Sequence, residues 1–323
     1  MRRSTGAKIQ LFLLNPISPA EMETAMQAKE STAWKVMVGG GKRWKIGESL
    51  SLSFAEITLE AERINIIDET SEVRFKWSGA SSFADVLDHL GNIPLPPYMK
   101  REVEESDFFR YQTTYADVVG SVAAPTAGLH FNEEVMNQLL CKQIKRSTVT
   151  LHIGAGTFKP VSSNDFRTHK MHAEQVLVTR EEISQLAEED TRICVGTTSL
   201  RSLESLYWFA VRLKRGDRPS IIGQWDPYEL EDPFESYEEA MSYLHQNVSG
   251  HDVEFETEIM ITPEYCIKSV DAIITNFHLP KSTLLLLVYA FIQEDWKKVY
   301  DYALKNNYRF LSFGDSSLLW VQE

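Results

Sequence analysis

Four histidines in this sequence lie in loops whose composition suits a ligand site. Of eight histidines in the chain, these four have small or hydroxyl residues close by, and they are His130, His152, His172 and His278. A structural role is the usual explanation for any one of them. Imidazole accepts and donates protons near neutral pH, so four such placements together favour acid–base or orienting roles.

The first of these loops, Gly120–Phe131, reads Gly-Ser-Val-Ala-Ala-Pro-Thr-Ala-Gly-Leu-His-Phe. This composition suits neither a long helix nor a well-packed strand, whereas small residues let a backbone approach a ligand. Asn132 is a good N-cap for a helix over residues 133–142, which places His130 at a loop-to-helix junction. A tight connection with only a capping role is the alternative.

Three further loops combine histidine with small or polar residues, and a fourth, Val195–Arg201, has small and hydroxyl residues but no histidine. Leu151–Phe158 follows a predicted strand and carries Gly-Ala-Gly-Thr after His152; a Gly-x-Gly alone is weak evidence for nucleotide binding. Val195–Arg201 leads from a strand into a helix whose N-terminus can receive a carboxylate or phosphate, although ordinary Ser/Thr capping is the better explanation of this motif by itself. Lys170–Glu174 and Thr275–Ser282 each place a histidine among polar residues, and ligands of α/β sheets bind at the carboxyl ends of strands.

The elements that must hold these loops fall into two parts. Residues 1–78 predict a small antiparallel β-barrel or sandwich, of which we expect the barrel, with strands at 9–14, 34–38, 49–54, 57–67 and 73–77. Residues 79–323 predict a larger α/β domain, because helical and strand patterns alternate there, and we expect it to be barrel-like. Helices are expected at 83–90, 133–142, 179–190, 199–212, 236–246, 281–293 and from 296, where Trp296, Val299, Tyr300, Ala303 and Leu304 mark an inner face. Strands are expected at 147–153, 192–195 and 270–275, and the acidic stretch around 236–246 reads as an insertion.

Composition and charge limit the possible functions. The chain has 323 residues, 43% of them hydrophobic, and a formal net charge of −13. Such a charge argues against a general nucleic-acid binder, although a local basic face remains possible at Lys42, Arg43, Lys45, Lys100 and Arg101. The longest apolar run, Leu284–Ile292, is too short to span a bilayer. Three distant cysteines and the lack of a visible signal peptide favour a cytoplasmic protein with reduced thiols and no metal.

Taken together, these segments resemble the S-adenosylmethionine:tRNA ribosyltransferase-isomerase family of queuosine biosynthesis. The matching motifs are Tyr111–Thr113, Gly120–Phe131, Leu151–Phe158, Met171–Glu174, Val195–Arg201, Thr275–Leu285, Tyr308–Phe310 and Gly314–Asp315. The resemblance implies transfer of the ribosyl part of S-adenosylmethionine to the aminomethyl group of a 7-deazaguanine base in tRNA. Isomerisation then gives epoxyqueuosine, with release of adenine and methionine. It also implies S-adenosylmethionine and tRNA as partners, no further cofactor and no membrane, and we expect a monomer.

The resemblance also indicates which residues form the site. We assign acid–base or orienting roles to the four histidines, without assigning individual steps. The expected substrate-binding residues are Tyr111, Gln112, Ser121, Pro125, Thr126, Gly128, Gly154, Gly156, Thr157, Phe158, Glu174, Thr197, Thr198, Ser199, Arg201, Asn276, Phe277, Lys281, Ser282, Thr283, Arg309 and Asp315. Arg201 and Lys281 are candidates for holding a carboxylate or a tRNA phosphate. A surface ion pair is the alternative role for both.

The chain departs from the family pattern at its start. Family members carry a longer leading segment with an Asn-Asp-Thr-Arg-like stretch, whereas this sequence begins almost directly at Gly6–Gln10. We therefore expect an incomplete larger domain. Two alternatives to the enzyme follow: a non-catalytic relative that binds a nucleoside or tRNA, and an enzyme that uses another sulfonium or ribosyl donor with a small-molecule acceptor.

Overall fold

The chain divides into two compact units. The first unit comprises Met1–Phe108 with Val119–Ala123, and the second comprises Phe109–Val118 with Ala124–Glu323. The computed structural model describes, apart from the side chains of Phe108 and His152, residues 1, 3, 6–41, 44–67, 70–93, 95, 99, 101, 103–116, 124–152, 165–188, 191–248 and 252–322.

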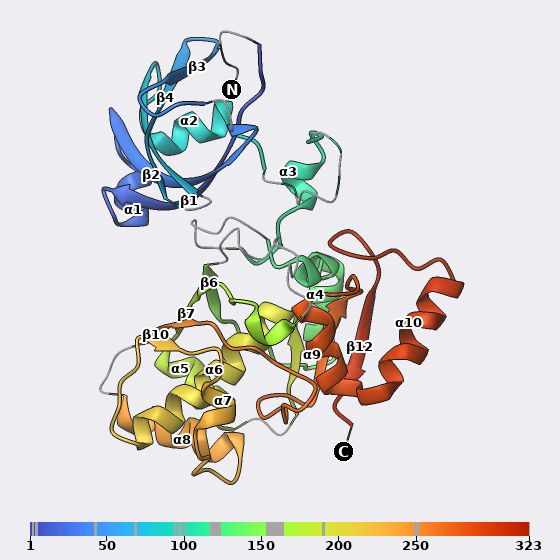
Figure 1. The fold of residues 1–323 in the computed structure, drawn as a ribbon. Helices are drawn as coiled ribbons and strands as arrows, with labels where there is room; N and C mark the ends of the chain where they lie inside the picture. Colours follow the sequence, from blue (N-terminus) through green and yellow to red (C-terminus); the bar gives the residue numbers. More distant parts are fainter. Residues whose placement is uncertain are drawn as a thin grey trace. The chain divides into compact units, whose positions relative to one another are not determined.

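The first unit is one antiparallel sheet of five strands with two short helices (Figure 1). Its strands pair in the order β1-β2-β5-β4-β3. The elements are β1 (Gln10–Ser18), α1 (Met22–Met26), β2 (Ser31–Gly39), β3 (Ser49–Phe54), β4 (Ile57–Ile67), β5 (Thr70–Ser78) and α2 (Phe83–Leu90). Alternate residues of β2, β4 and β5 are buried, which is the period of a sheet with one face on a core.

Helix α2 closes the core of the first unit. Its Phe83 ring lies 5.3 to 5.6 Å, between centroids, from the rings of Trp34, Phe75 and Trp77. Phe83 is fully buried, and the side chain of Ser82 caps the helix by accepting from the Asp85 N–H. The helix therefore packs with the first unit, beyond the boundary expected at residues 78 and 79. The division into domains of residues 1–78 and 79–323 stays a prediction.

The second unit contains two mixed sheets. One has the order β6-β7-β10-β9 and the other the order β12-β11-β8. Only β9–β10 and β8–β11 pair in parallel among the described strands of this unit. The strands are β6 (Thr150–His152), β7 (Glu174–Val178), β8 (Ile193–Val195), β9 (Ile221–Ile222), β10 (Val253–Thr257), β11 (Ala272–Asn276) and β12 (Ser316–Trp320).

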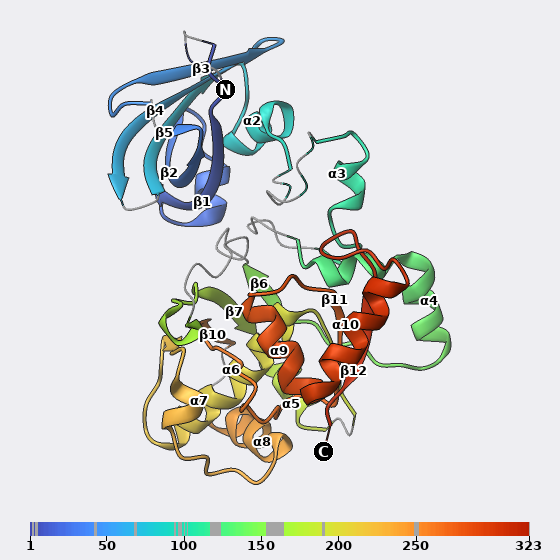
Figure 2. The same cartoon turned by 45° about the vertical axis from the view of Figure 1, so that its right-hand side comes forward.

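Helices surround these sheets, and α9 and α10 lie beside β12 in both views (Figures 1 and 2). The α-helices are α3 (Asp107–Arg110), at which the two units divide, α4 (Glu133–Cys141), α5 (Arg180–Leu186), α6 (Thr197–Lys214), α7 (Asp226–Glu229), α8 (Tyr237–Asn247), α9 (Thr283–Ile292) and α10 (Trp296–Lys305). The 3₁₀-helices are η3 (Thr126–His130), η5 (Phe166–Thr168) and η6 (Gln293–Asp295). Asn132 caps α4 and a Thr179–Glu182 capping box opens α5, as their sequences predict.

Helix α6 is the central element of the second unit. Leu200 and Leu206 are fully buried in the core, and Ser205 shares a 2.6 Å hydrogen bond with Thr257 of β10. Glu204 is also fully buried, and burial raises the pKa of its carboxyl group. That carboxylate accepts from the Ser269 hydroxyl at 2.6 Å and from the Tyr265 hydroxyl at 2.5 Å. The helix therefore holds the segment that precedes β11.

The mixed α/β class is confirmed, whereas the barrel-like form of both domains is not. The sheets are largely antiparallel, and the described strands form open sheets that end at β1 and β3, at β6 and β9, and at β12 and β8. Strands β7, β9, β10 and β12 were not expected from the sequence. Helix α8 is no peripheral insertion, because Tyr237, Ala240 and Leu244 belong to the main core. Leu304 is 64% exposed, so the expected inner face of α10 is wrong at that residue.

Candidate functional site

The carboxyl ends of β8 and β11 meet and define one edge of the site. The two strands are parallel neighbours, and the Gly196 N–H donates to the Ile274 carbonyl at 2.9 Å. Gly196 has a φ of 91°, a conformation that favours glycine, and forms the N-cap of α6. A Cβ at Gly196 would lie 3.7 Å from the Ala127 Cβ. The loops after two strands and the segment 124–131 therefore come together.

A histidine–asparagine–threonine chain lies at this edge. Asn276, at the end of β11 and 4% exposed, donates from its Nδ2 to His130 Nε2 at 3.2 Å. Thr126 Oγ1 donates to Asn276 Oδ1, also at 3.2 Å. Because the amide nitrogen is a donor, Nε2 of a neutral His130 ring is the acceptor and the ring proton is on Nδ1. The chain thus fixes the orientation and tautomer of an exposed imidazole.

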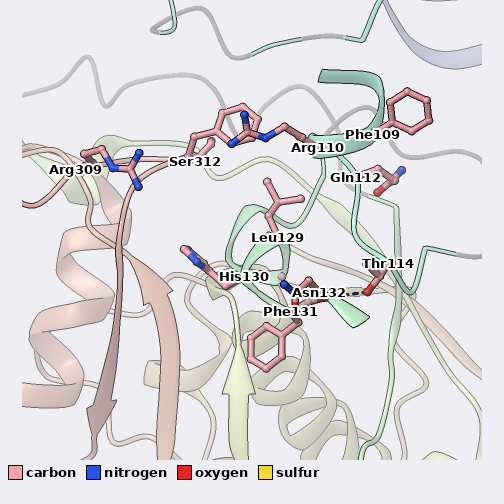
Figure 3. A pocket seen from close by; sticks show the side chains of 13 residues that line it. Phe109, Arg110, Gln112, Thr114, Leu129, His130, Phe131, Asn132, Arg309 and Ser312 are labelled. Carbon is pink, nitrogen blue, oxygen red and sulfur yellow. Dashed lines mark hydrogen bonds between the residues drawn. The ribbon is translucent and has the colours of Figure 1, made fainter. Parts of the chain in front are cut away.

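His130 faces a pocket of about 310 Å³ whose described lining comes entirely from the second unit (Figure 3). Its volume is at the lower end of small-molecule sites, which run to about 1,000 Å³. Thr114 Oγ1 donates to the Phe131 carbonyl at 2.9 Å beside it. The lining residues are Phe109, Arg110, Gln112, Thr114, Gly128, Leu129, His130, Phe131, Asn132, Arg309, Ser312, Phe313 and Gly314.

The charged side chains of this lining are Arg110 and Arg309, and it contains no aspartate or glutamate. Arg309 is 74% exposed and lies 3.7 Å from an oxygen of Asp315, which offsets part of its charge. The Arg110 guanidinium lies 5.8 Å from the centroid of the Phe313 ring. A pocket with this lining attracts an anionic or planar ligand more than a cationic one.

His278 has a different environment from His130. It is 8% exposed, its ring Nε2 shares a 3.0 Å hydrogen bond with Thr275 Oγ1, and its backbone N–H donates to the Tyr300 hydroxyl. Burial lowers the pKa of its imidazole to about 4. The ring is therefore neutral at pH 7, and it does not line the described pocket. An orienting role suits it better than proton exchange with a ligand.

Arg201 and Glu174 form a buried ion pair between α6 and the start of β7. Arg201 Nη1 lies 3.0 Å from Glu174 Oε2, and its Nε donates to the Ile259 carbonyl at 3.1 Å. Their side chains are 8% and 6% exposed, so the ion pair of Arg201 is buried and not the surface pair given as its alternative role. Arg201 Nη2 is buried and makes no hydrogen bond among the described residues. Since β6 pairs with β7 through His152 and Gln175, this pair lies near the carboxyl end of β6.

The structure gathers some of the expected site residues and separates others. Gln112, Gly128, His130 and Arg309 line the pocket, with Thr126 and Asn276 behind His130. Tyr111 and Phe277 are buried, and the Tyr111 ring lies 5.4 Å from that of Phe313. The pocket lining does not include Pro125, His172, Glu174, Thr197, Thr198, Ser199, Arg201, His278, Lys281, Ser282, Thr283 or Asp315.

Several of these residues have structural roles that their sequence allows. Ser282 caps α9, with Thr283 as the first residue of that helix, and Lys281 is exposed before it with a φ of 59°. Thr197, Thr198 and Ser199 form the first turn of α6, and His172 is exposed. Ser121, Gly154, Gly156, Thr157, Phe158 and the His152 side chain lie outside the described residues. Convergence of all four histidines stays a prediction.

Sequence reasoning missed much of the pocket wall. Phe109, Arg110, Phe313 and Ser312 were not expected to line a site. Phe109 and Arg110 directly precede the Tyr111–Thr113 motif, and Ser312 and Phe313 lie between Phe310 and Gly314. Their position next to motif residues was the one sequence feature that could have identified them as site residues. Gly128 is required for a reason other than ligand approach, because a Cβ there would lie 2.0 Å from the Tyr115 hydroxyl.

Two further searches cover only the described residues. No cluster of three or more histidine, cysteine, aspartate or glutamate side chains in them could hold a metal ion. Within the same residues, no helix has the length and apolar character needed to cross a membrane.

Comparison with known proteins gives consistent matches. A family model described as queuosine biosynthesis protein matches residues 1–319. The S-adenosylmethionine:tRNA ribosyltransferase-isomerase of Caldanaerobacter subterraneus is 36% identical over 98% of this chain and 79% of that protein. The Staphylococcus haemolyticus protein of the same name is 38% identical over 99% and 79%. A crystal structure of an S-adenosylmethionine tRNA ribosyltransferase from Thermotoga maritima is 23% identical, with a TM-score of 0.38, over 97% of this chain and 75% of that one.

Proposed function

This chain belongs to the family of queuosine biosynthesis proteins, and we propose that it transfers and isomerises the ribosyl group of S-adenosylmethionine. The proposed acceptor is the aminomethyl group of a 7-deazaguanine base in tRNA. Relatives that cover nearly the whole chain carry the corresponding name, which supports the assignment.

In the proposed reaction the amine nitrogen forms a bond to a carbon of the ribosyl group and gives up one proton. The carbon–sulfur bond breaks and methionine leaves with the electron pair, while the glycosidic bond to adenine also breaks. The remaining carbon skeleton becomes an epoxycyclopentanediol, so epoxyqueuosine forms in the tRNA. The sulfonium is already a good leaving group, and the protein must chiefly remove protons beside the sulfonium and from the amine, and protonate adenine.

The observation that carries this proposal is the His130–Asn276–Thr126 chain at the mouth of the pocket. The Asn276 amide leaves His130 with a defined tautomer at an exposed position. Proton transfer by a positioned imidazole typically contributes about 10²- to 10⁴-fold to the rate, and for His130 it requires Nε2 to leave the Asn276 amide. We therefore assign His130 the acid–base role at this pocket, and His278 an orienting role through Thr275 and Asn276.

Residues around the Arg201–Glu174 ion pair supply a second set of contacts for S-adenosylmethionine, the ribosyl donor. Arg201 Nη2 is a buried donor with no hydrogen bond in the described part of the chain, so it can hold the methionine carboxylate. The half-buried first turn of α6, on the same helix as Arg201, carries backbone N–H groups and the hydroxyls of Thr197 and Thr198. We assign these groups to the methionine and ribose parts of the donor.

We also propose that the enzyme is a cytoplasmic monomer that needs no metal or further cofactor, and that both domains have the barrel-like form implied by the resemblance. The three cysteines are free thiols, which supports a reducing compartment.

The test is incubation with S-adenosylmethionine and tRNA that carries the deazaguanine precursor. Mass spectrometry of digested tRNA should find epoxyqueuosine, and chromatography should find one adenine for each modified nucleoside. Calorimetry that shows donor binding without adenine release would favour the non-catalytic relative. Adenine release that does not depend on tRNA would favour an enzyme with a small-molecule acceptor.

A further inference from the structure

The pocket presents three kinds of group that suit a single-stranded RNA nucleotide. Two arginines, Arg110 and Arg309, supply positive charge. The Phe109 ring lines the pocket and is 85% exposed, and Gln112 and Asn132 supply side-chain amides. These residues lie around Leu129 and His130 in Figure 3. Proteins bind RNA phosphates with cationic side chains, stack aromatic rings on base faces, and hydrogen-bond base edges with groups such as side-chain amides.

The cations suit a phosphate better than they suit the donor. S-adenosylmethionine carries a sulfonium, an ammonium and one carboxylate group, so its net charge is positive and two of its three charged groups favour a carboxylate partner. The described lining offers Arg110 and Arg309 but no carboxylate. Arg110 makes no ion pair among the described residues, and it lies over the Phe313 ring. In a chain with a net charge of −13, such a local cationic lining is what an RNA backbone requires.

The two amides both present donors to the pocket. Asn132 Oδ1 accepts from the Val135 N–H at 2.9 Å as the cap of α4, and Gln112 Oε1 accepts from the Thr113 N–H at 2.9 Å. Their carbonyl oxygens are thus in use, whereas their NH₂ groups make no hydrogen bond among the described residues. A 7-deazaguanine has carbon in place of the N7 acceptor, so O6 is the acceptor left on that edge. An amide NH₂ is the matching donor.

We propose that this pocket receives the modified nucleotide of the tRNA, unstacked from its neighbours. Its phosphate lies on Arg110 and Arg309, its base or a neighbouring base stacks on Phe109, and Gln112 or Asn132 donates to O6. The aminomethyl group then reaches the His130 ring. This inference rests on the proposed function and adds which substrate fills the pocket and which side chains select it.

The test measures tRNA affinity by fluorescence anisotropy and donor affinity by calorimetry, with tRNA that carries the precursor. Arg110→Ala and Arg309→Ala are each expected to raise the Kd for tRNA about tenfold, and Phe109→Ala about 5- to 150-fold. The donor Kd stays within about twofold. Arg218→Ala and Leu304→Ala are the matched controls, since both side chains are exposed in the second unit away from the pocket.

Gln112→Glu and Asn132→Asp supply a separate measurement of base reading. Each replaces the NH₂ donor by an acceptor while it keeps the oxygen that holds the local backbone N–H. Both are expected to weaken binding of precursor tRNA, and Arg110→Lys to retain most of the affinity lost in Arg110→Ala. Equal thermal melting of all variants confirms that the effects are not due to unfolding.

The outcomes separate this inference from the proposed function. If the wild-type protein modifies tRNA and the pocket variants bind tRNA normally, the inference is overturned and the function stands. If the pocket variants lose affinity for S-adenosylmethionine and keep their affinity for tRNA, the pocket binds S-adenosylmethionine and the inference is likewise overturned. If the wild-type protein neither modifies nor binds tRNA, the proposed function fails.

Discussion

Asn276 determines what His130 can do, because its amide is buried while the imidazole that it contacts is exposed. The Nδ2 donor selects the tautomer with the proton on Nδ1, and Thr126 holds the amide in that orientation. Asn276 is therefore a positioning residue. Its effect on the reaction passes through the imidazole.

Replacement of Asn276 tests this coupling. Asn276→Asp replaces the Nδ2 donor by a carboxylate oxygen, which can only accept from Nε2 and so selects the opposite tautomer of His130. Both Asn276→Asp and Asn276→Ala are expected to lower kcat about tenfold or more while the Kd for the donor stays within about twofold. Asn306→Asp, at an exposed asparagine that donates to the Tyr302 carbonyl, is the control; an unchanged kcat in Asn276→Asp would argue against the coupling.

His278, which follows the same end of β11, makes the free energy of unfolding depend on pH. Its pKa is about 4 in the folded protein, against 6.5 in the unfolded chain. The unfolded state therefore binds more protons between these values, so the contribution is present above pH 6.5 and is lost as the pH falls towards 4. The size of the effect is about 3 kcal/mol. Urea unfolding at pH 7 and 4.5 should show a smaller pH dependence for His278→Gln than for the wild type, whereas His89→Gln, at an exposed histidine, should match the wild type.

At the scale of elements, helix α6 is held against the sheet by buried polar contacts as well as by its apolar face. Arg201 pairs with Glu174 at the start of β7, and Ser205 pairs with Thr257 of β10. These contacts set where the N-terminus of α6 lies relative to β7. A buried pair of this kind stabilises only while both partners are present.

Removal of one partner should therefore be costly. Glu174→Gln or Arg201→Met is expected to destabilise the second unit by about 3 to 5 kcal/mol, because an unpaired charge or a lone polar group stays buried. The double variant should recover part of the loss. Thermal melting measures both. Lys297→Met, in an exposed pair with Glu294, should change stability by less than about 1 kcal/mol, and an equally small effect at Glu174 would contradict the account.

The same elements show what could be predicted from sequence. Strands β3 and β4 have the predicted bounds, because alternation and turn residues are local signals. Asn132 and the Thr179–Glu182 box were readable for the same reason. Strand β10 was missed although it alternates buried and exposed residues, and β12, with three of its five residues buried or half-buried, gave a weaker pattern.

The candidate site divides in the same way. His130 and Asn276 were identifiable by residue type, but their contact joins positions 146 residues apart. No local pattern encodes such a contact. The wall residues Phe109 and Phe313 looked like ordinary apolar residues, and only the fold places them on one pocket.

For the whole molecule, charge decides how tRNA can be held. With 33 basic and 46 acidic residues, affinity must come from a small number of local cations. Each phosphate contact to single-stranded RNA contributes about −0.7 to the slope of log K against log salt. We expect Arg110→Ala and Arg309→Ala each to reduce the slope by about that amount, and Arg218→Ala to leave it unchanged. Identical slopes would mean that other cations bind the backbone.

The most direct test of the account is single-turnover adenine release by the wild-type protein and by His130→Gln, with donor and precursor tRNA in place. The account predicts that adenine and epoxyqueuosine form in equal amounts, and that both rates fall together by about 10²- to 10⁴-fold in the variant while donor affinity is kept. A variant that releases adenine and modifies tRNA at the wild-type rate would contradict it.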